Sequence, residues 1–103
     1  MPSISYTIKY SAETIEDLKV ISDYYAQINV LLKNRFKDTV LNSERELLLN
    51  PFAFSKVNFQ DFRRIKLKKF PYKVIYRIEN NTIYVFCVLH TARSNRYMKK
   101  RLK

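Results

Sequence analysis

The apolar residues of this chain change their spacing near residue 60, and this change constrains the fold more than any other feature. Across residues 12–49 they recur every three or four positions, which is the period of a helix with one buried face. Across residues 61–90 they mostly alternate with polar residues, which is the period of a strand. A chain in which a long helical segment is followed by a run of strands is expected to fold as an α+β domain.

The start of the chain predicts one strand that leads into a helix. Residues 3–10 place Ile or Tyr at every second position, so their side chains would share one face of a strand. Ser11 or Thr14 can then cap the first turn of the helix that follows.

The helical segment is too long for a single helix in a domain of this size, so two antiparallel helices are expected. We place the break between them near Gln27–Asn29 and the end of the second at Asn50-Pro51, because the residue before a proline disfavours helical geometry. The buried stripes are predicted to be Ile15, Leu18, Ile21, Tyr25 and Ile28 in the first helix, and Leu32, Phe36, Val40 and Leu47 in the second.

Three strands are expected after a polar connector over residues 53–61. The first, over residues 63–68, would point Arg64, Lys66 and Lys68 to one side and its apolar residues to the other. The strands over residues 72–78 and 83–90 follow, and the last is apolar on both faces, which favours a central position with helices covering one side.

The turn between these last two strands is expected at Asn80-Asn81. Asparagine tolerates a positive φ angle, and the chain contains no glycine that could serve instead. The predicted order is therefore β-α-α-β-β-β, with a helical hairpin packed on a mainly antiparallel sheet of about four strands.

We expect one domain over residues 1–103, made of a strand and helical hairpin (1–60), a basic antiparallel sheet (61–90) and a basic tail (91–103). The tail is predicted to be a short helix or an irregular arm that contributes little to the core. One cysteine cannot form an internal disulfide, and neither a signal-peptide core nor a membrane-length apolar run is present. A soluble cytoplasmic protein without membrane association is therefore expected.

The net charge of +11 is confined to one part of the chain. Residues 1–60 hold seven Lys/Arg and seven Asp/Glu, whereas residues 61–103 hold thirteen Lys/Arg and two Asp/Glu. Such a one-sided positive field attracts nucleic acid, the ribosome or an acidic partner segment. The alternative is a basic surface that only maintains solubility, although solubility alone usually intersperses both signs of charge.

Several kinds of active site are excluded by composition. A glycine-rich phosphate loop cannot form without glycine, and one Cys with one His cannot complete a zinc site. No pair of carboxylates is spaced for acid–base chemistry in the basic half. No cofactor and no metal are therefore expected, and the remaining candidates are Arg, Lys, Tyr and His side chains on the strands and tail.

Two stretches of the basic half have a recognisable pattern. Residues 63–79 form a basic strand followed by Phe-Pro-Tyr at 70–72, which opens the next strand. Residues 88–97 close the last strand with the pattern His90-x-x-Arg93. Their order and spacing resemble the RelE/ParE superfamily of toxins from type II toxin–antitoxin systems, over about residues 61–97.

The resemblance implies roles for particular residues. In the ribosome-dependent ribonucleases of this superfamily, cations hold the mRNA and stabilise the charged transition state. The corresponding positions here are Arg64, Lys66, Lys73 and Arg93. The proton-handling tyrosine of the RelE branch would stand at position 99, which is Lys here, and Tyr97 lies two residues earlier.

The candidate residues divide into two groups. Those that resemble catalytic positions are Lys73, His90, Arg93 and Tyr97. Those expected to bind the target are Arg63, Arg64, Lys66, Lys68, Arg77, Arg96 and Arg101. Each group has a structural alternative: His90 is more often a surface residue that forms hydrogen bonds than a catalyst, and Tyr97 and Arg101, four residues apart, would pin the tail.

Three functions follow from these patterns. The favoured one is a ParE-like toxin that poisons DNA gyrase, because the helical region is long and the last strand ends in His-x-x-Arg. The alternatives are a RelE-like, ribosome-dependent mRNA endoribonuclease and a non-toxic, basic RNA-binding accessory protein. A toxin of either kind implies a cognate antitoxin with an acidic or amphipathic C-terminal segment, and contact with operator DNA only through the antitoxin complex.

Overall fold

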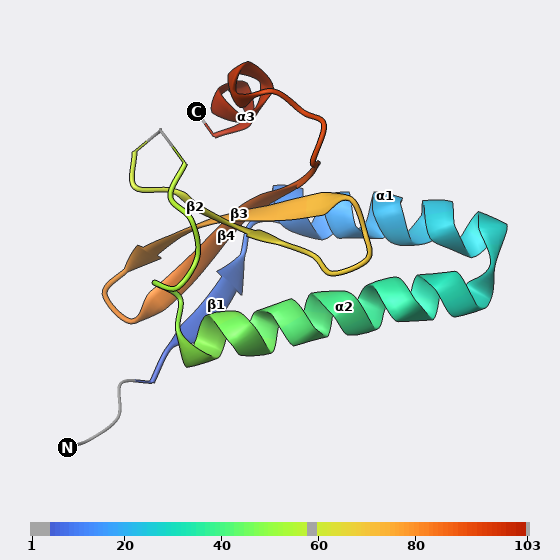
Figure 1. Ribbon diagram of the computed structural model, residues 1–103, viewed down its shortest axis with the longest axis horizontal. Helices are drawn as coiled ribbons and strands as arrows, with labels where there is room; N and C mark the ends of the chain where they lie inside the picture. Colours follow the sequence, from blue (N-terminus) through green and yellow to red (C-terminus); the bar gives the residue numbers. More distant parts are fainter. Residues whose placement is uncertain (1–4, 58–59, 103) are drawn as a thin grey trace.

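The computed structural model describes residues 5–57 and 60–102. Figure 1 shows a long helical hairpin beside a twisted sheet, with a short third helix near the C-terminus. The elements, in chain order, are β1 (Thr7–Tyr10), α1 (Ala12–Ile28), α2 (Val30–Leu49), β2 (Arg63–Lys66), β3 (Tyr72–Glu79), β4 (Thr82–His90) and α3 (Asn95–Arg101). The predicted α+β class and element order are confirmed, and of the two forms predicted for the tail the structure has the short helix, α3. Residues 3 and 4 of the predicted first strand lie outside the described residues.

The sheet has four strands in the order β1-β4-β3-β2. β1 runs parallel to β4, whereas the pairs β4–β3 and β3–β2 are antiparallel. The prediction of a mainly antiparallel sheet with a central last strand is therefore confirmed. Between Ile75 and Tyr76 of β3 the pairing partner moves from Cys87 to Val85, so Phe86 of β4 forms a bulge.

The two hairpin helices are defined by polar caps. The hydroxyl of Ser11 accepts a hydrogen bond of 3.0 Å from the Thr14 backbone N–H at the start of α1. Asn29 is both the C-cap of α1 and the N-cap of α2. Its extended backbone interrupts the helix, and its side chain accepts a hydrogen bond from the Leu31 N–H. The predicted break near Gln27–Asn29 and the predicted end at Asn50 are both confirmed.

The main core lies between the hairpin and one face of the sheet. Ile21, Tyr25, Phe36 and Leu47 from the helices pack there against strand residues that include Val74, Tyr76, Val85 and Val88. The prediction that Ile15 and Ile28 belong to the buried stripe of α1 is wrong, since Ile15 is 60% exposed and Ile28 is 58% exposed. Ile15 faces away and buried Thr14 lies towards the sheet instead, whereas Ile28 is at the hairpin end that extends beyond the sheet (Figure 1).

A second core covers the opposite face of the sheet, where the sequence predicted no helix. Phe62, Ile75, Cys87 and Leu89 meet Met98 and Leu102, which are only 2% and 8% exposed. The prediction that the tail contributes little to the core is therefore wrong. Burial in this cluster raises the pKa of the Cys87 thiol to about 12, so the thiol stays protonated and packs as an apolar group.

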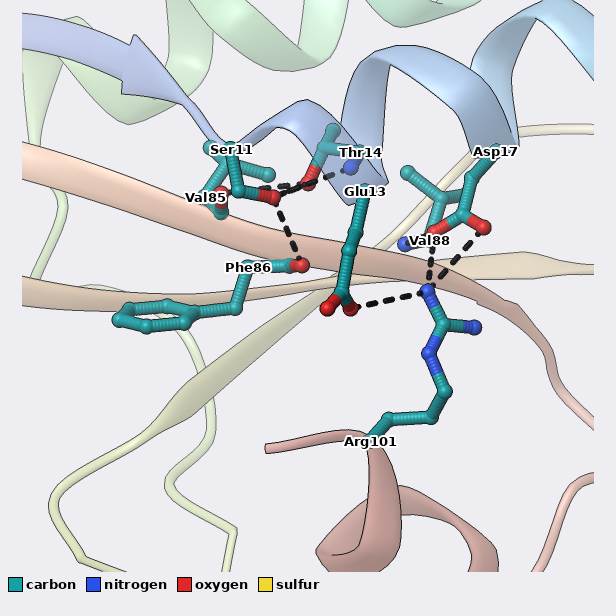
Figure 2. Close-up of polar contacts among 8 residues, drawn as sticks. All are labelled: Ser11, Glu13, Thr14, Asp17, Val85, Phe86, Val88 and Arg101. Carbon is teal, nitrogen blue, oxygen red and sulfur yellow. Dashed lines mark hydrogen bonds and ion pairs between the residues drawn. The ribbon is translucent and has the colours of Figure 1, made fainter. Parts of the chain in front are cut away.

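Polar side chains of α1 continue the hydrogen bonding of the sheet where β1 ends. β1 pairs with β4 only as far as Val85. Beyond that point, Thr14 donates to the Val85 carbonyl and Ser11 to the Phe86 carbonyl, while Asp17 accepts from the Val88 N–H (Figure 2). Ser11 and Asp17 thereby satisfy the Phe86 carbonyl and the Val88 N–H of the central strand, whereas the Val85 carbonyl accepts from Thr14 in addition to the backbone N–H of Ser11.

The β3–β4 turn has a left-handed residue, Asn80, with φ 55°. Because glycine adopts this geometry without a steric cost, Asn80→Gly is expected to leave stability unchanged or raise it by a few tenths of a kcal/mol, whereas Asn80→Ala should lower it by about 1 kcal/mol. Urea unfolding of the two variants measures the difference. An alanine variant as stable as the glycine variant would contradict this account of the turn.

No helix within residues 5–57 and 60–102 is long and apolar enough to cross a membrane.

Candidate functional site

Cations from three segments gather on the α3 side of the sheet. In β2, Arg64 and Lys66 stand opposite Ile75 and Lys73 of β3, and residues paired in this way share a face. Ile75 belongs to the core beneath α3, so Arg64, Lys66 and Lys73 lie on that side. The chain after β4 brings Arg93 to the same place, because the Arg93 carbonyl accepts a 3.2 Å hydrogen bond from the Lys73 ammonium.

Lys73 is the buried member of this cluster, with 4% of its surface exposed. Burial lowers the pKa of its ammonium, and the nearby charges of Arg64 and Lys66 lower it further. A negatively charged ligand would offset the repulsion among these three cations. The cluster is therefore suited to bind an anion such as a phosphate or a carboxylate.

Arg93 is exposed, and it contacts Tyr97, which is partly buried against the second core. The guanidinium carbon of Arg93 lies 4.4 Å from the centroid of the Tyr97 ring. Ser94, the residue after Arg93, caps α3, because its hydroxyl accepts a hydrogen bond from the Tyr97 N–H. This arrangement places a planar cation and an aromatic ring side by side, and the backbone carbonyl of the same arginine binds Lys73.

The fourth residue that resembled a catalytic position, His90, lies apart from the other three. It pairs with Tyr72 across the strands, whereas Lys73 pairs with Leu89, and side chains at successive strand positions point to opposite faces. The His90 ring packs edge-on against Tyr72, with 5.6 Å between centroids, and its Nδ1 accepts from the Ala92 N–H. The structure thus brings Lys73, Arg93 and Tyr97 together and places His90 on the hairpin side.

Arg63 and Arg77, which were expected to bind the target, instead have partners inside the protein. Arg63 donates to the carbonyls of Phe52 and Phe54, at 3.2 and 2.7 Å, and lies over the Phe52 ring. Arg77 lies over the rings of Phe62 and Phe86 and pairs with Glu79 at 2.6 Å. Arg63 therefore holds the start of the connector in position, and Arg77 holds the β4 bulge.

Arg101 ties the tail to the hairpin. Its guanidinium donates to both carboxylate oxygens of Asp17, at 3.1 and 2.9 Å, and lies 3.6 Å from Glu13 (Figure 2). Burial acts to lower the pKa of this guanidinium, but the hydrogen bonds with Asp17 and Tyr97 outweigh burial and raise it. The structural alternative, in which Tyr97 and Arg101 pin the tail, fits these contacts.

The remaining target-binding candidates are open to solvent. The prediction that Lys68 shares a strand face with Arg64 and Lys66 is wrong, because β2 ends at Lys66. Lys68 makes a 3.4 Å ion pair with Glu46 of α2, and the two side chains are 79% and 41% exposed. Such an exposed pair contributes little to stability and is easily replaced. Arg96 is exposed on α3. Together with Lys66 and Arg93, these side chains give the α3 side and the adjoining sheet edge a positive surface.

Sequence reasoning missed the polar contacts of α1. The carboxylate of Asp17 links α1, β4 and α3. The available signal was the spacing of Ser11, Thr14 and Asp17, which places three short polar side chains three residues apart on one helix face. No group of three or more potential metal-ligating side chains converges within the described part of the chain.

Comparisons with known proteins agree with this fold. The chain resembles a chromosomal ParDE toxin–antitoxin structure from P. aeruginosa with 18% identity and a TM-score of 0.73, covering 85% of this chain and 98% of that one. It resembles the free E. coli toxin RelE, in a mutant form, with 17% identity and a TM-score of 0.62, covering 96% and 99%. It also resembles the E. coli RelBE toxin–antitoxin complex, with 16% identity and a TM-score of 0.57, covering 86% and 100%.

At these identities the structural matches show the fold alone, and the search of curated proteins found no match. The family model described as the ParE toxin of the type II toxin–antitoxin system parDE matches residues 8–95, from the first strand to the start of α3. The chain therefore belongs to the ParE family of type II toxins.

Proposed function

We propose that this ParE-family toxin arrests growth by poisoning DNA gyrase. The family match over residues 8–95 carries the proposal, because it spans the hairpin, the sheet and the cationic cluster. The position of His90 supports it, since His90 lies on the hairpin side of the sheet, away from Lys73, and a protein that acts by binding needs no proton-transfer group at the cationic cluster.

The partner of this toxin is proposed to be a cognate antitoxin. One of the similar structures is described as a ParDE system and another as the RelBE complex. A C-terminal antitoxin segment of acidic or amphipathic character would offset the excess of +11 charges in residues 61–103. Contact with operator DNA is proposed to occur only through the antitoxin complex.

Gyrase poisoning predicts a specific result with purified components. Adding the toxin should block supercoiling of relaxed plasmid by gyrase and leave cleaved DNA attached to the enzyme. Relaxation of the same plasmid by a type I topoisomerase in the same salt is the control, because a protein with charge +11 can also coat DNA non-specifically. Equal inhibition of both enzymes, or full gyrase activity at saturating toxin, would contradict the proposal.

One observation favours a second function, a ribosome-dependent mRNA endoribonuclease. The Arg93 guanidinium lies over the Tyr97 ring, so a phosphate bound by Arg93 would be held next to a phenol that exchanges a proton. In this case Arg93→Ala should lower the cleavage rate by about a hundredfold or more, since a cation that stabilises the transition state is lost. Arg35→Ala, which removes an exposed arginine of α2 outside the cationic cluster, is the matched control.

The two functions are separated by mapping mRNA 5′ ends on translating ribosomes. New ends in the decoding site that vanish in Arg93→Ala, together with unaffected gyrase, would replace the gyrase assignment by the ribonuclease one.

The family assignment gives no support to the third hypothesis, a non-toxic accessory protein. Normal growth of cells that contain verified, folded protein would revive it.

A further inference from the structure

β2 is the last strand of the sheet and has one open side. Leu67 donates through its backbone N–H to Tyr72, so in the antiparallel register Ile65 and Leu67 use their backbone groups to bind β3. The backbone N–H and C=O groups of Arg64 and Lys66 then point away from the sheet. An unpaired strand edge of this kind is a template for another strand.

The connector closes only the first part of this edge. The Arg64 N–H donates to the Ser55 carbonyl at 3.0 Å, and Lys56 bridges to Arg63. At Lys66 no backbone group within the described residues pairs with the outward N–H or C=O. The free edge therefore begins at the Arg64 carbonyl and runs through Lys66.

An open groove of about 470 Å³ follows the free edge. Its lining comprises Glu46, Ala53, Phe54, Ser55, Arg64, Ile65, Lys66 and Lys68. Three cations therefore face one carboxylate, and that carboxylate is already paired with Lys68. The groove thus combines free backbone groups with an excess of positive charge.

The charge of the edge decides which strand fits it. A second copy of this chain would bring the same cations opposite Arg64, Lys66 and Lys68, and such lysine-rich edges resist self-pairing. The protein's own basic tail is fixed on the second core by Met98 and Leu102. An acidic strand instead meets Arg64 and Lys66 on one face of β2, with Lys68 just beyond the end of the strand.

We propose that the free edge of β2 at Arg64–Lys66 binds an extended, acidic peptide segment of a partner protein, which adds a strand to the sheet. Its carboxylates lie beside Arg64 and Lys66, and its backbone bonds to the outward groups of Lys66. The inference rests on the proposed function for its partner, since the antitoxin is the protein that would carry the segment. The binding chemistry is tested without the antitoxin and without any toxicity assay.

The probe is a fluorescent peptide of about eight residues that alternates Glu and Val, matched to the usual length of a strand. Fluorescence polarisation with the full chain should show saturable binding, and a Lys–Val peptide of the same length should not bind. Amide hydrogen exchange at Lys66 should slow when the acidic peptide binds, because its N–H gains a partner.

Backbone methylation tests strand addition directly. Only alternate amides of an added strand point at the sheet, so two acidic peptides are compared, one methylated at its Glu amides and the other at its Val amides. If the added strand is antiparallel, the peptide methylated at Glu should bind at least about tenfold more weakly than the other. If the added strand is parallel, the peptide methylated at Val should be the weaker one. Equal effects of the two methylated peptides, or unchanged exchange at Lys66, would overturn strand addition and leave only charge attraction.

Two variants of one residue provide the matching test on the protein. Lys66→Pro removes the outward N–H, a position at which an edge strand tolerates proline, and Lys66→Ala removes only the charge. The proline variant should bind the acidic peptide about tenfold more weakly than the alanine variant. Equal affinities of two folded variants would contradict the proposal, and if the proline variant does not fold, the methylated peptides decide.

Peptide binding by a chain that leaves gyrase and ribosomes unaffected would support this inference while the proposed function fails.

Discussion

Replacing Asp17 with alanine is expected to lower the free energy of unfolding by about 3 kcal/mol. The Asp17 carboxylate accepts the Val88 N–H at 3.0 Å and two bonds from Arg101, and hydrogen bonds to charged groups contribute about 1.5–3 kcal/mol. Its side chain is 19% exposed and that of Arg101 is 23% exposed, so solvent screens the pair only in part. The variant leaves Arg101 with Glu13, whose side chain is 63% exposed and contributes little.

Two further variants separate the contributions at this position. Asp17→Asn keeps an oxygen for the Val88 N–H but removes the charge that pairs with Arg101, so it should cost less than the alanine variant. Glu16→Ala removes an exposed carboxylate from the neighbouring position and should change stability by no more than about 0.5 kcal/mol. Urea unfolding measures all three, and an alanine variant as stable as the Glu16 control would show that the link among α1, β4 and α3 does not stabilise the fold.

The parts of the fold that could be predicted are those encoded by local signals. Asn29 ends one helix and begins the next through its own side chain, and Asn80 supplies a positive φ angle in a chain without glycine. The change from helical to strand spacing near residue 60 depends only on neighbouring residues. Such signals act within one or two turns of chain, and they predicted the break in the hairpin, the turn and the element order.

The parts that could not be predicted depend on rotation and register. Thr14 is buried and Ile15 is exposed because the hydroxyl of Thr14 donates to the Val85 carbonyl. A helical stripe chosen by hydrophobicity alone cannot anticipate a threonine that pairs with a distant strand. Met98 and Leu102 were overlooked because the basic residues around them dominate the composition of the tail.

The candidate site shows the same division. The alternating pattern around Arg64 and Lys66 placed them on one face, and the register of β2 with β3 adds Lys73 to that face. His90 falls on the other face because its position relative to Lys73 depends on the pairing of two strands, which the sequence does not display. Burial of Lys73 also required the tail, whose Arg93 carbonyl binds the ammonium.

Truncation of the chain after Ser94 is expected to lower the free energy of unfolding by about 5 kcal/mol or more, which is the reverse of what the composition of the tail suggested. Removing Met98 and Leu102 opens the second core, and each buried Met or Leu that is lost from a core costs about 2–5 kcal/mol. Loss of Arg101 also leaves Asp17 without its main partner. Because small domains are stable by only about 5–15 kcal/mol, much of the truncated protein should be unfolded.

Point variants in the full chain distinguish the tail's packing from its charge. Met98→Ala and Leu102→Ala should each lower stability by about 2–5 kcal/mol, whereas Lys100→Ala, an exposed cation of the same helix, should change it by no more than about 0.5 kcal/mol. Thermal unfolding followed by circular dichroism measures these differences. A truncated chain with the stability of the full protein would show that the second core forms without α3. Loss of toxicity on truncation therefore identifies a target contact only when a folded variant such as Lys100→Ala loses it too.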